Sequence, residues 1–189
     1  VNGWMPNSNG FNPVTKRYLS HGYGISVTAL QMVNAYSTIA NKGIMMKPHI
    51  VKAFLDSKGE IKEYVQPQKI RRVISKRTCD TLADMLCGVV ERGTGKRARI
   101  KGMKIGGKTG TSQQLVNGSY ENHHYTGSFI GFLPAYDPEI AMIVVIDKPR
   151  GAYYGGATAA PVFQSIAMRW IAVNTEFNYG KSVKSNDTV

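Results

Sequence analysis

Hydrophobic residues recur at helical spacing in two stretches of the first half of the chain. The first stretch follows Thr28, where Thr28 and Gln31 form a capping box and Gly43 is a natural C-terminal end. The second follows Ser75 and keeps apolar residues at helical spacing up to Gly93. These patterns predict two amphipathic helices. The first twenty residues are rich in Asn, Gly and Pro, and we expect them to form a loop.

Extended segments occupy the intervals between and after these helices. Residues 49–55 and 61–65 have strand-like composition and flank turn residues at positions 56–59, so the sequence predicts a small hairpin. Residues 100–111 form a further extended segment with several glycines. The order helix, hairpin, helix and extended segment therefore precedes the second half of the chain.

Two more strands follow, at residues 125–133 and 140–146. Asn117-Gly118 is a hairpin signal before the first of them, and Asp137-Pro138 turns the chain between them. Three consecutive strands joined by short turns predict an antiparallel meander with a helix against one face. The predicted fold class is therefore α+β.

A last helix is expected after a loop at residues 151–156. It begins near Pro161, because proline suits a first helical position. We expect it to bury the following apolar side chains: Val162, Phe163, Ile166, Ala167, Trp170 and Ile171. Residues 1–175 are then predicted to form one folded portion, and residues 176–189 a polar tail.

Length and composition fit one globular unit. The chain has 189 residues and is 42% hydrophobic. Its longest apolar run, residues 140–146, is far shorter than the roughly 20 residues that span a bilayer. The chain begins without methionine and without a secretory signal pattern, so we expect any signal or anchor to lie upstream.

Charge is high and unevenly distributed. The formal net charge is +12, and residues 92–108 contain no acidic residue. The basic run consists of Arg92, Lys96, Arg97, Arg99, Lys101, Lys104 and Lys108. Such a run favours an anionic partner, although a solvated basic face explains it equally well. A non-catalytic module that binds an anionic polymer thus stays open, but no nucleic-acid motif accompanies the run and we expect no nucleic-acid partner.

The two cysteines, Cys79 and Cys87, lie on the second predicted helix. Helical rise separates them by about 12 Å. A disulfide requires alpha carbons within about 7 Å, so the sequence predicts that they do not pair with each other. We expect both to be core residues.

The most informative segment for chemistry surrounds Lys108-Thr109-Gly110-Thr111. Lys108 offers a positive charge, Thr109 and Thr111 offer hydroxyl groups, and Gly110 lets another backbone approach closely. The segment can therefore receive an extended peptide that ends in a carboxylate, with the cation and the hydroxyls facing one groove. The triplet alone is equally compatible with a glycine-rich strand that carries an ordinary exposed lysine.

Two further segments flank this triplet in the chain. Residues 22–31 read GYGISVTALQ, residues 153–156 read YYGG, and residues 160–163 read APVF. With KTGT at residues 108–111 between them, the chain resembles the class B penicillin-binding proteins, the monofunctional transpeptidases that cross-link peptidoglycan. The resemblance extends to about Ala172, and the segment at 22–31 is more similar to the division and sporulation branch than to the elongation branch.

The resemblance implies a fold and roles for the central residues. The fold is the β-lactamase/transpeptidase-like one, in which a five-stranded antiparallel sheet lies between helical layers, and this chain would be its C-terminal portion. Lys108 matches the lysine that supports proton transfer around the nucleophile. Thr109, Gly110 and Thr111 match the strand that binds the substrate carboxylate. The backbone N–H of Thr111 matches a donor of the oxyanion hole.

Tyr154 and Gly155 would lie at the rim of the cleft, although a tight turn before a helix explains them equally well. The family's Ser-x-x-Lys and Ser-x-Asn motifs are absent: no serine here precedes such a lysine or asparagine. Residues 120–122 read Tyr-Glu-Asn, but they follow the Lys-Thr-Gly triplet, and we interpret them as hairpin loop. We therefore expect the nucleophile upstream and this segment alone to be inactive.

The resemblance further implies an acyl transfer on D-Ala-D-Ala stem peptides, with β-lactams as mimics. It implies no metal and no organic cofactor. The expected partners are the upstream part of the same domain and, more remotely, glycosyltransferases or division proteins. The expected location is the extracytoplasmic side of the bacterial inner membrane. A D,D-carboxypeptidase or a β-lactamase relative remains the alternative within the same chemistry.

Two other features bear on partners. His123 and His124 are adjacent, and adjacent side chains on a strand point to opposite faces, so they make a poor metal-ligand pair. We expect them at a loop tip. Residues 140–146 would expose a hydrophobic edge if the sheet's remaining strands lie upstream, and the segment expressed alone is then predicted to associate through that edge.

Overall fold

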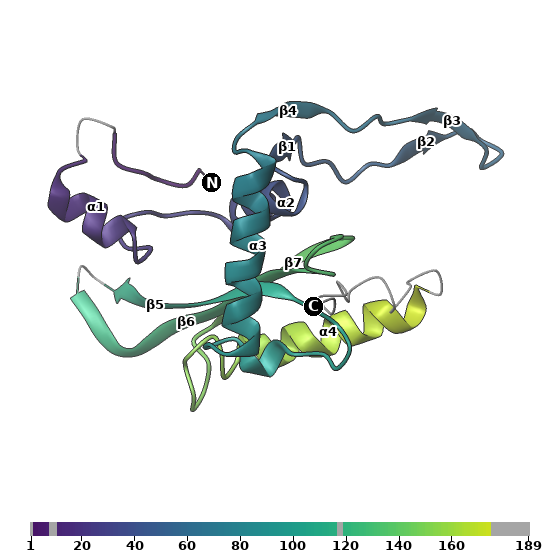
Figure 1. Cartoon of the computed structure of the whole chain (residues 1–189). Coiled ribbons are helices and arrows are strands. Elements are labelled where there is room, and N and C mark those ends of the chain that lie inside the picture. Colours follow the sequence, from purple (N-terminus) through teal and green to yellow (C-terminus); the bar gives the residue numbers. More distant parts are fainter. Residues whose placement is uncertain (1, 8–10, 117–118, 175–189) are drawn as a thin grey trace, which may run out of the picture.

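The computed structural model describes residues 2–7, 11–116 and 119–174 (Figure 1). Its helices are α1 (Pro13–Leu19), α2 (Ala29–Ala40), α3 (Lys76–Glu91) and α4 (Ala159–Val173), with a 3₁₀ turn, η2, at Lys96–Ala98. Its strands are β1 (Ile44–Met46), β2 (Ala53–Leu55), β3 (Ile61–Tyr64), β4 (Lys69–Arg72), β5 (Gly106–Val116), β6 (Ser119–Leu133) and β7 (Ile140–Asp147). The α+β class is confirmed.

The main sheet is the predicted antiparallel meander. Its strand order is β5-β6-β7, so β5 and β7 are its two edges within the described residues. Lys108 is opposite Ile130 on β6, and Phe129 of β6 is opposite Val144 on β7. Asp137 and Pro138 lie in the connection between β6 and β7, as expected.

Helices cover both faces of this sheet rather than one. Phe132 on β6 packs with Leu86 and Cys87 of α3, and residues of α2 pack against the same cluster. Phe129 lies on the opposite face of the sheet and packs with Phe163 of α4, at a ring-centroid distance of 4.7 Å. In Figure 1, α3 crosses in front of the sheet and α4 lies behind it. Burying each phenylalanine contributes about 2 kcal/mol, so β6 is the structural centre of the chain.

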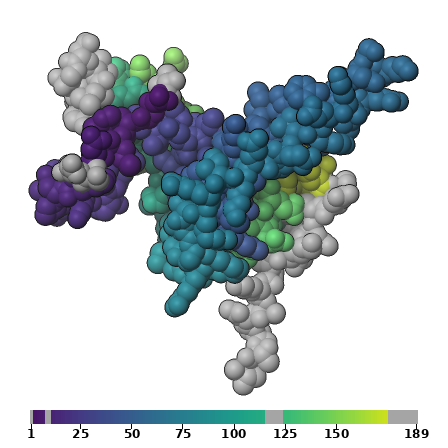
Figure 2. All heavy atoms as spheres, turned by 90° about the horizontal axis from the view of Figure 1, so that it is seen from above, coloured from purple at the N-terminus to yellow at the C-terminus, as the bar shows by residue number. Residues whose placement is uncertain are grey.

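The predicted hairpin is part of a longer two-stranded arm. β1 pairs with β4 and β2 with β3, both antiparallel. The arm projects away from the sheet, which Figure 2 shows in blue from above. The sequence did not indicate β1 or β4, since each is only three or four residues long and lies beside positive charges. Strand β2 also begins at Ala53 rather than at residue 49.

Side-chain caps set the first residues of helices α2 and α3. Thr28 and Gln31 form the predicted capping box at the start of α2. The Ser75 side chain accepts from the backbone of Thr78 and starts α3, also as predicted. Both cysteines lie on α3, buried and unpaired, which confirms the spacing argument. Burial raises the pKa of both thiols above the ordinary value, so neither is activated.

Two helical expectations were wrong. The N-terminal segment contains α1, because Asn12 accepts from the Thr15 backbone and Pro13 occupies the first helical position. Helix α4 begins at Ala159, within two residues of the predicted start near Pro161, but its buried face differs from the expected one. Val162 and Ile166 are 39% and 43% exposed, because the buried stripe of α4 runs through Phe163, Ala167 and Ile171 instead.

The second strand of the meander was underestimated. β6 begins at Ser119, so residues 120–122 and the His123-His124 pair belong to a strand and not to a loop tip. The first extended segment was placed too early, since residues 100–103 form a turn and β5 begins at Gly106. The Asn117-Gly118 turn and the polar tail at 176–189 fall outside the described residues.

Candidate functional site

Strand β5 places the Lys-Thr-Gly-Thr segment at the edge of the main sheet. Lys108 is exposed, and its ammonium Nζ donates to the Thr109 carbonyl at 2.9 Å. Thr109 and Gly110 are half-buried, and Thr111 is exposed. In an edge strand, alternate residues turn their N–H and C=O groups away from the neighbouring strand. The segment thus offers backbone hydrogen-bonding groups beside a positive charge.

The cation and the hydroxyls do not share one face of the strand. Lys108 and Gly110 lie on the face covered by α3, where Gly110 is opposite Ser128. Thr109 and Thr111 lie on the face covered by α4, because successive strand residues point to opposite sides. A ligand that meets both must lie along the free edge of β5, between the two faces.

The space that glycine leaves at position 110 is used differently from what the sequence predicts. A Cβ at Gly110 would stand 2.4 Å from the Ser128 hydroxyl oxygen, so the missing side chain leaves room for that hydroxyl. Ser128 thus adds a hydroxyl beside Lys108 on the same face. No local sequence pattern marks Ser128, because its place opposite Gly110 depends on the pairing register of β5 with β6.

The loop before α4 packs onto strand β5. The backbone N–H of Gly155 donates to the Thr111 hydroxyl at 3.1 Å. A Cβ at Gly155 would stand 2.2 Å from the Ser128 carbonyl oxygen and 2.3 Å from that of Gly110. Only glycine fits this close approach of two backbones. The YYGG and KTGT segments, far apart in the sequence, therefore meet in the fold.

Three tyrosines extend this contact past Thr111. The rings of Tyr125 and Tyr153 stack at 4.2 Å, and those of Tyr153 and Tyr154 lie 4.4 Å apart. The Tyr153 hydroxyl donates to that of Tyr154 at 3.0 Å, and this bond raises the pKa of Tyr153. Tyr154 is 60% exposed. The sequence patterns indicated Tyr154 but not Tyr125. Tyr125 reaches this cluster through its pairing position opposite Gln113 of β5, which is a feature of the fold.

Much of the basic run is engaged within the chain. Arg99 donates to the carbonyls of Val90 and Glu91 at the end of α3, where cations complement the helix dipole. Lys104 pairs with the Glu91 carboxylate at 3.5 Å. Arg97 donates to the Ala157 carbonyl at 3.3 Å. These basic side chains therefore stabilise the fold, which weakens the argument that the run binds an anionic polymer.

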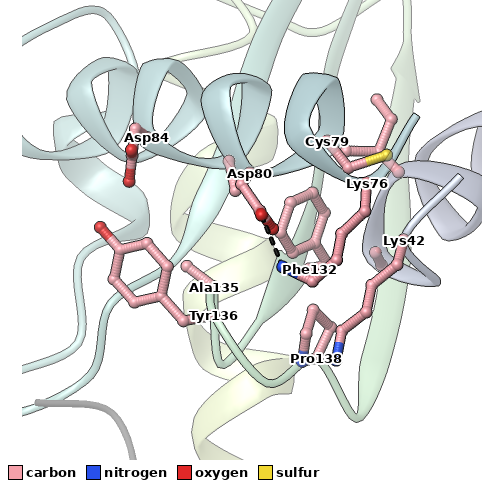
Figure 3. A pocket seen from close by; sticks show the side chains of 12 residues that line it. Lys42, Lys76, Cys79, Asp80, Asp84, Phe132, Ala135, Tyr136 and Pro138 are labelled. Carbon is pink, nitrogen blue, oxygen red and sulfur yellow. Dashed lines mark hydrogen bonds and ion pairs between the residues drawn. The ribbon is translucent and has the colours of Figure 1, made fainter. Parts of the chain in front are cut away.

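A separate hollow of about 160 Å³ lies between α2, α3 and the β6–β7 connection (Figure 3). Phe132 and Ala83 are among its apolar lining residues. At its mouth, Lys76 and Asp80 form an ion pair at 2.7 Å. The Asp80 carboxylate is thus already paired, and the hollow does not include the Lys108 strand.

Metal and membrane features can be judged only for the described residues. Across 2–7, 11–116 and 119–174, no group of three or more His, Cys, Asp or Glu side chains could hold a metal ion. No helix in that part of the chain is both long and apolar enough to cross a bilayer. The contacts between β5, Ser128 and the loop before α4 define the candidate site.

Comparisons with known proteins agree with the sequence pattern. The family model described as penicillin binding protein transpeptidase domain matches residues 1–168. Stage V sporulation protein D of Bacillus subtilis (strain 168) is 38% identical over 157 residues, which cover 82% of this chain and 24% of that protein. The probable peptidoglycan D,D-transpeptidase PenA of Neisseria flavescens is 35% identical over 150 residues, 78% of this chain and 35% of that protein.

A solved structure has the same arrangement. Penicillin binding protein 3 from Mycobacterium tuberculosis, in its apo-form, aligns with a TM-score of 0.79 at 35% identity, over 90% of this chain and 40% of that one. The same protein has also been solved with aztreonam and with ampicillin. This chain therefore spans between 24% and 40% of the length of these relatives.

Proposed function

This chain belongs to the penicillin-binding protein transpeptidase family, and we propose that it is the C-terminal portion of a serine-type D,D-transpeptidase domain that cross-links peptidoglycan. We assign residues 1–175 to that portion. The nucleophilic serine comes from the preceding part of the domain, because no serine in this chain stands in the required motif.

The reaction is an acyl transfer in two steps. The serine oxygen attacks the carbonyl carbon between two D-Ala residues, the C–N bond breaks, and D-Ala leaves with the proton that the serine gave up. The amine of a neighbouring stem peptide then attacks the resulting ester. A new peptide bond forms, and the serine oxygen recovers a proton. Lys108 is the catalytic cation of this chain, since it supports proton transfer around the serine.

Recognition of the peptide rests on the free edge of β5. The terminal carboxylate is bound by the hydroxyls of Thr109 and Thr111, beside Gly110, and the Thr111 N–H donates to the developing oxyanion. The YYGG loop, with Tyr154 and Gly155, forms the rim of the cleft. The observation that carries this assignment is the contact of the Gly155 N–H with the Thr111 hydroxyl at 3.1 Å, which joins the two motif segments at one edge.

The other edge of the sheet, strand β7, is apolar and has a different role. β7 carries the apolar sequence from Ile140 to Ile146 and has no partner strand beyond β6 in the described residues. We assign that edge to strands from the preceding part of the same domain. The parent protein is then an envelope protein that acts on the extracytoplasmic side of the inner membrane. Glycosyltransferases and division proteins are its candidate neighbours there.

The assignment is tested on the intact protein that carries this chain. Incubation with a fluorescent penicillin and denaturing electrophoresis should give one covalent adduct that persists. The products from D-Ala-D-Ala stem peptides should be cross-linked dimers. Free shortened peptides would instead indicate a carboxypeptidase, and rapid release of hydrolysed penicillin would indicate a β-lactamase relative. Absence of any adduct would contradict the proposal.

A further inference from the structure

We propose that Thr94, in the turn after α3, is a positioning residue that sets the hydroxyl of Thr109 for recognition of the ligand carboxylate. The Thr94 hydroxyl oxygen lies 2.8 Å from that of Thr109. The inference rests on the proposed function, because it concerns how that function's carboxylate site is held. It gives a role to a residue that the motif pattern alone did not mark.

The turn that carries Thr94 is anchored on several sides. The backbone N–H groups of Gly93 and Gly95 both donate to the Val89 carbonyl, at 3.1 and 3.0 Å. A Cβ at Gly95 would stand 3.2 Å from the Phe129 ring, so the turn abuts the core. The Thr94 hydroxyl is therefore presented from a rigid base, not from a free loop.

The same turn also touches the rim loop. A Cβ at Gly156 would stand 2.4 Å from the Thr94 carbonyl oxygen, and the Arg97 guanidinium donates to the Ala157 carbonyl at 3.3 Å. The turn thus contacts both β5 and Gly156 through Thr94, and Arg97 of the adjacent 3₁₀ turn η2 adds a contact with Ala157, just after the YYGG segment. It connects the end of α3 with both segments of the candidate site.

These contacts fix the rotamer of Thr109. Its hydroxyl faces Thr94, whereas its methyl group lies 3.4 Å from a Cβ placed at Gly156. Rotation about the first side-chain torsion would exchange the hydroxyl and the methyl. Each hydroxyl has one proton and two acceptor sites, so Thr109 can accept from Thr94 and still donate to an anion. The Thr94 hydroxyl therefore holds Thr109 in the rotamer that can donate to a carboxylate.

Thr94→Val is the informative substitution. It keeps the size of the side chain but puts a methyl group against the Thr109 oxygen, so that oxygen loses its hydrogen-bond partner at position 94. Thr109 should then rotate its hydroxyl away from the ligand. In the intact protein, we expect the second-order rate constant for acylation by benzylpenicillin to fall about tenfold, the scale of a lost hydrogen bond to a charged group. Thr94→Ser keeps the hydroxyl and should restore the rate.

Two readouts separate positioning from a general structural defect. The methyl ester of benzylpenicillin lacks the carboxylate charge, and its rate constant should change little in Thr94→Val. In a double-mutant cycle, Thr94→Val should add nothing to Thr109→Val, because Thr94 acts through Thr109. Thr81→Val, which removes a threonine hydroxyl bonded to the Arg77 carbonyl on α3, serves as the matched control and should leave both rates unchanged.

Each outcome decides the matter. Equal losses for penicillin and its ester, additive effects of the two valine substitutions, or an unchanged penicillin rate would each overturn the role of Thr94. Loss of the adduct in the unsubstituted protein would instead refute the proposed function, so the two failures are distinguishable. Melting temperatures of all variants, recorded alongside, show whether any loss of rate follows a loss of fold.

Discussion

The two edges of the main sheet differ in every property that decides what can cover them. Edge β5 presents a lysine, two threonines and a glycine, and the YYGG loop packs on one of its faces. Edge β7 presents a run of aliphatic residues, with Val145 48% exposed. Polar groups can exchange water for a ligand and back, whereas an aliphatic edge is stable only under permanent cover. We therefore propose that the β5 edge binds a ligand and that the β7 edge pairs with a strand of the same protein.

The largest expected effect is the loss of the charge on the β5 edge. Lys108→Ala in the intact protein should reduce the rate of acylation by penicillin about a thousandfold, within the range typical for a group that assists proton transfer. The melting temperature should stay within a few degrees, because Lys108 is exposed. Lys101→Ala, which removes another exposed cation of the basic run, is the control. A rate close to that of the unsubstituted protein would remove Lys108 from the mechanism.

Blocking the loop contact on β5 should have the next largest effect. Gly155→Ala puts a Cβ within 2.3 Å of two carbonyl oxygens, so the loop must leave the strand. We expect a loss of about 2–3 kcal/mol in the free energy of unfolding, the scale of overpacking, together with slow acylation.

Gly88→Ala is the matched control, since a Cβ on that helical glycine would meet only the flexible Arg92 side chain. It should be neutral or stabilising by about 1 kcal/mol. Chemical denaturation measures both variants. Equal stabilities for the two would show that the loop does not depend on the missing side chain at position 155.

The β7 edge should respond to charge in a different way. In the isolated chain, Val145→Lys should shift the population from associated species toward monomer, because lysine on an edge strand opposes strand pairing. Met168→Lys, at an exposed apolar position of α4, should leave the association unchanged. Analytical sedimentation gives the result. A monodisperse monomer before any substitution would contradict the assignment of β7 as an edge that needs cover.

The smallest effect concerns the tyrosines beyond Thr111. The bond from the Tyr153 hydroxyl to that of Tyr154 raises the pKa of Tyr153, because it favours the neutral phenol. The contribution of this bond to stability is lost as the pH rises through the raised pKa of Tyr153. Tyr154→Phe should bring the pKa of Tyr153 back toward about 10. Absorbance titration at alkaline pH, with Tyr18→Phe as control, measures the shift. An unchanged titration would place the cause elsewhere.

The sequence predicted those parts of the fold that depend on local signals. The capping box at Thr28, the cap at Ser75 and the meander of three strands follow from spacing and turn residues, and all were confirmed. The start of α1 was missed because its signals, Asn12 and Pro13, also occur in loops. β1 and β4 were missed because a short strand pair is stabilised by its partner and not by its own composition.

The candidate site shows the same limit. Its first residues, Lys108 to Thr111, could be named because a contiguous motif carries them. Ser128, Tyr125 and Thr94 could not, because each reaches the site through strand register or through a turn that packs in three dimensions. The groove predicted to be shared by the cation and the hydroxyls stays a prediction. Because neighbours at positions 108 and 109 point to opposite faces, such a groove can lie only along the free edge of β5.

Hydrogen exchange on the intact protein, with and without a bound penicillin, tests the contrast between the two edges most directly. We expect the amide of Thr111, which we assign to the free edge of β5, to exchange rapidly in the free protein and to become protected on acylation. We expect amides of β7 to be protected to the same extent in both states, because a strand of the same protein already covers them. Protection of the Thr111 amide without ligand, or a change confined to β7, would contradict the proposed difference between the edges.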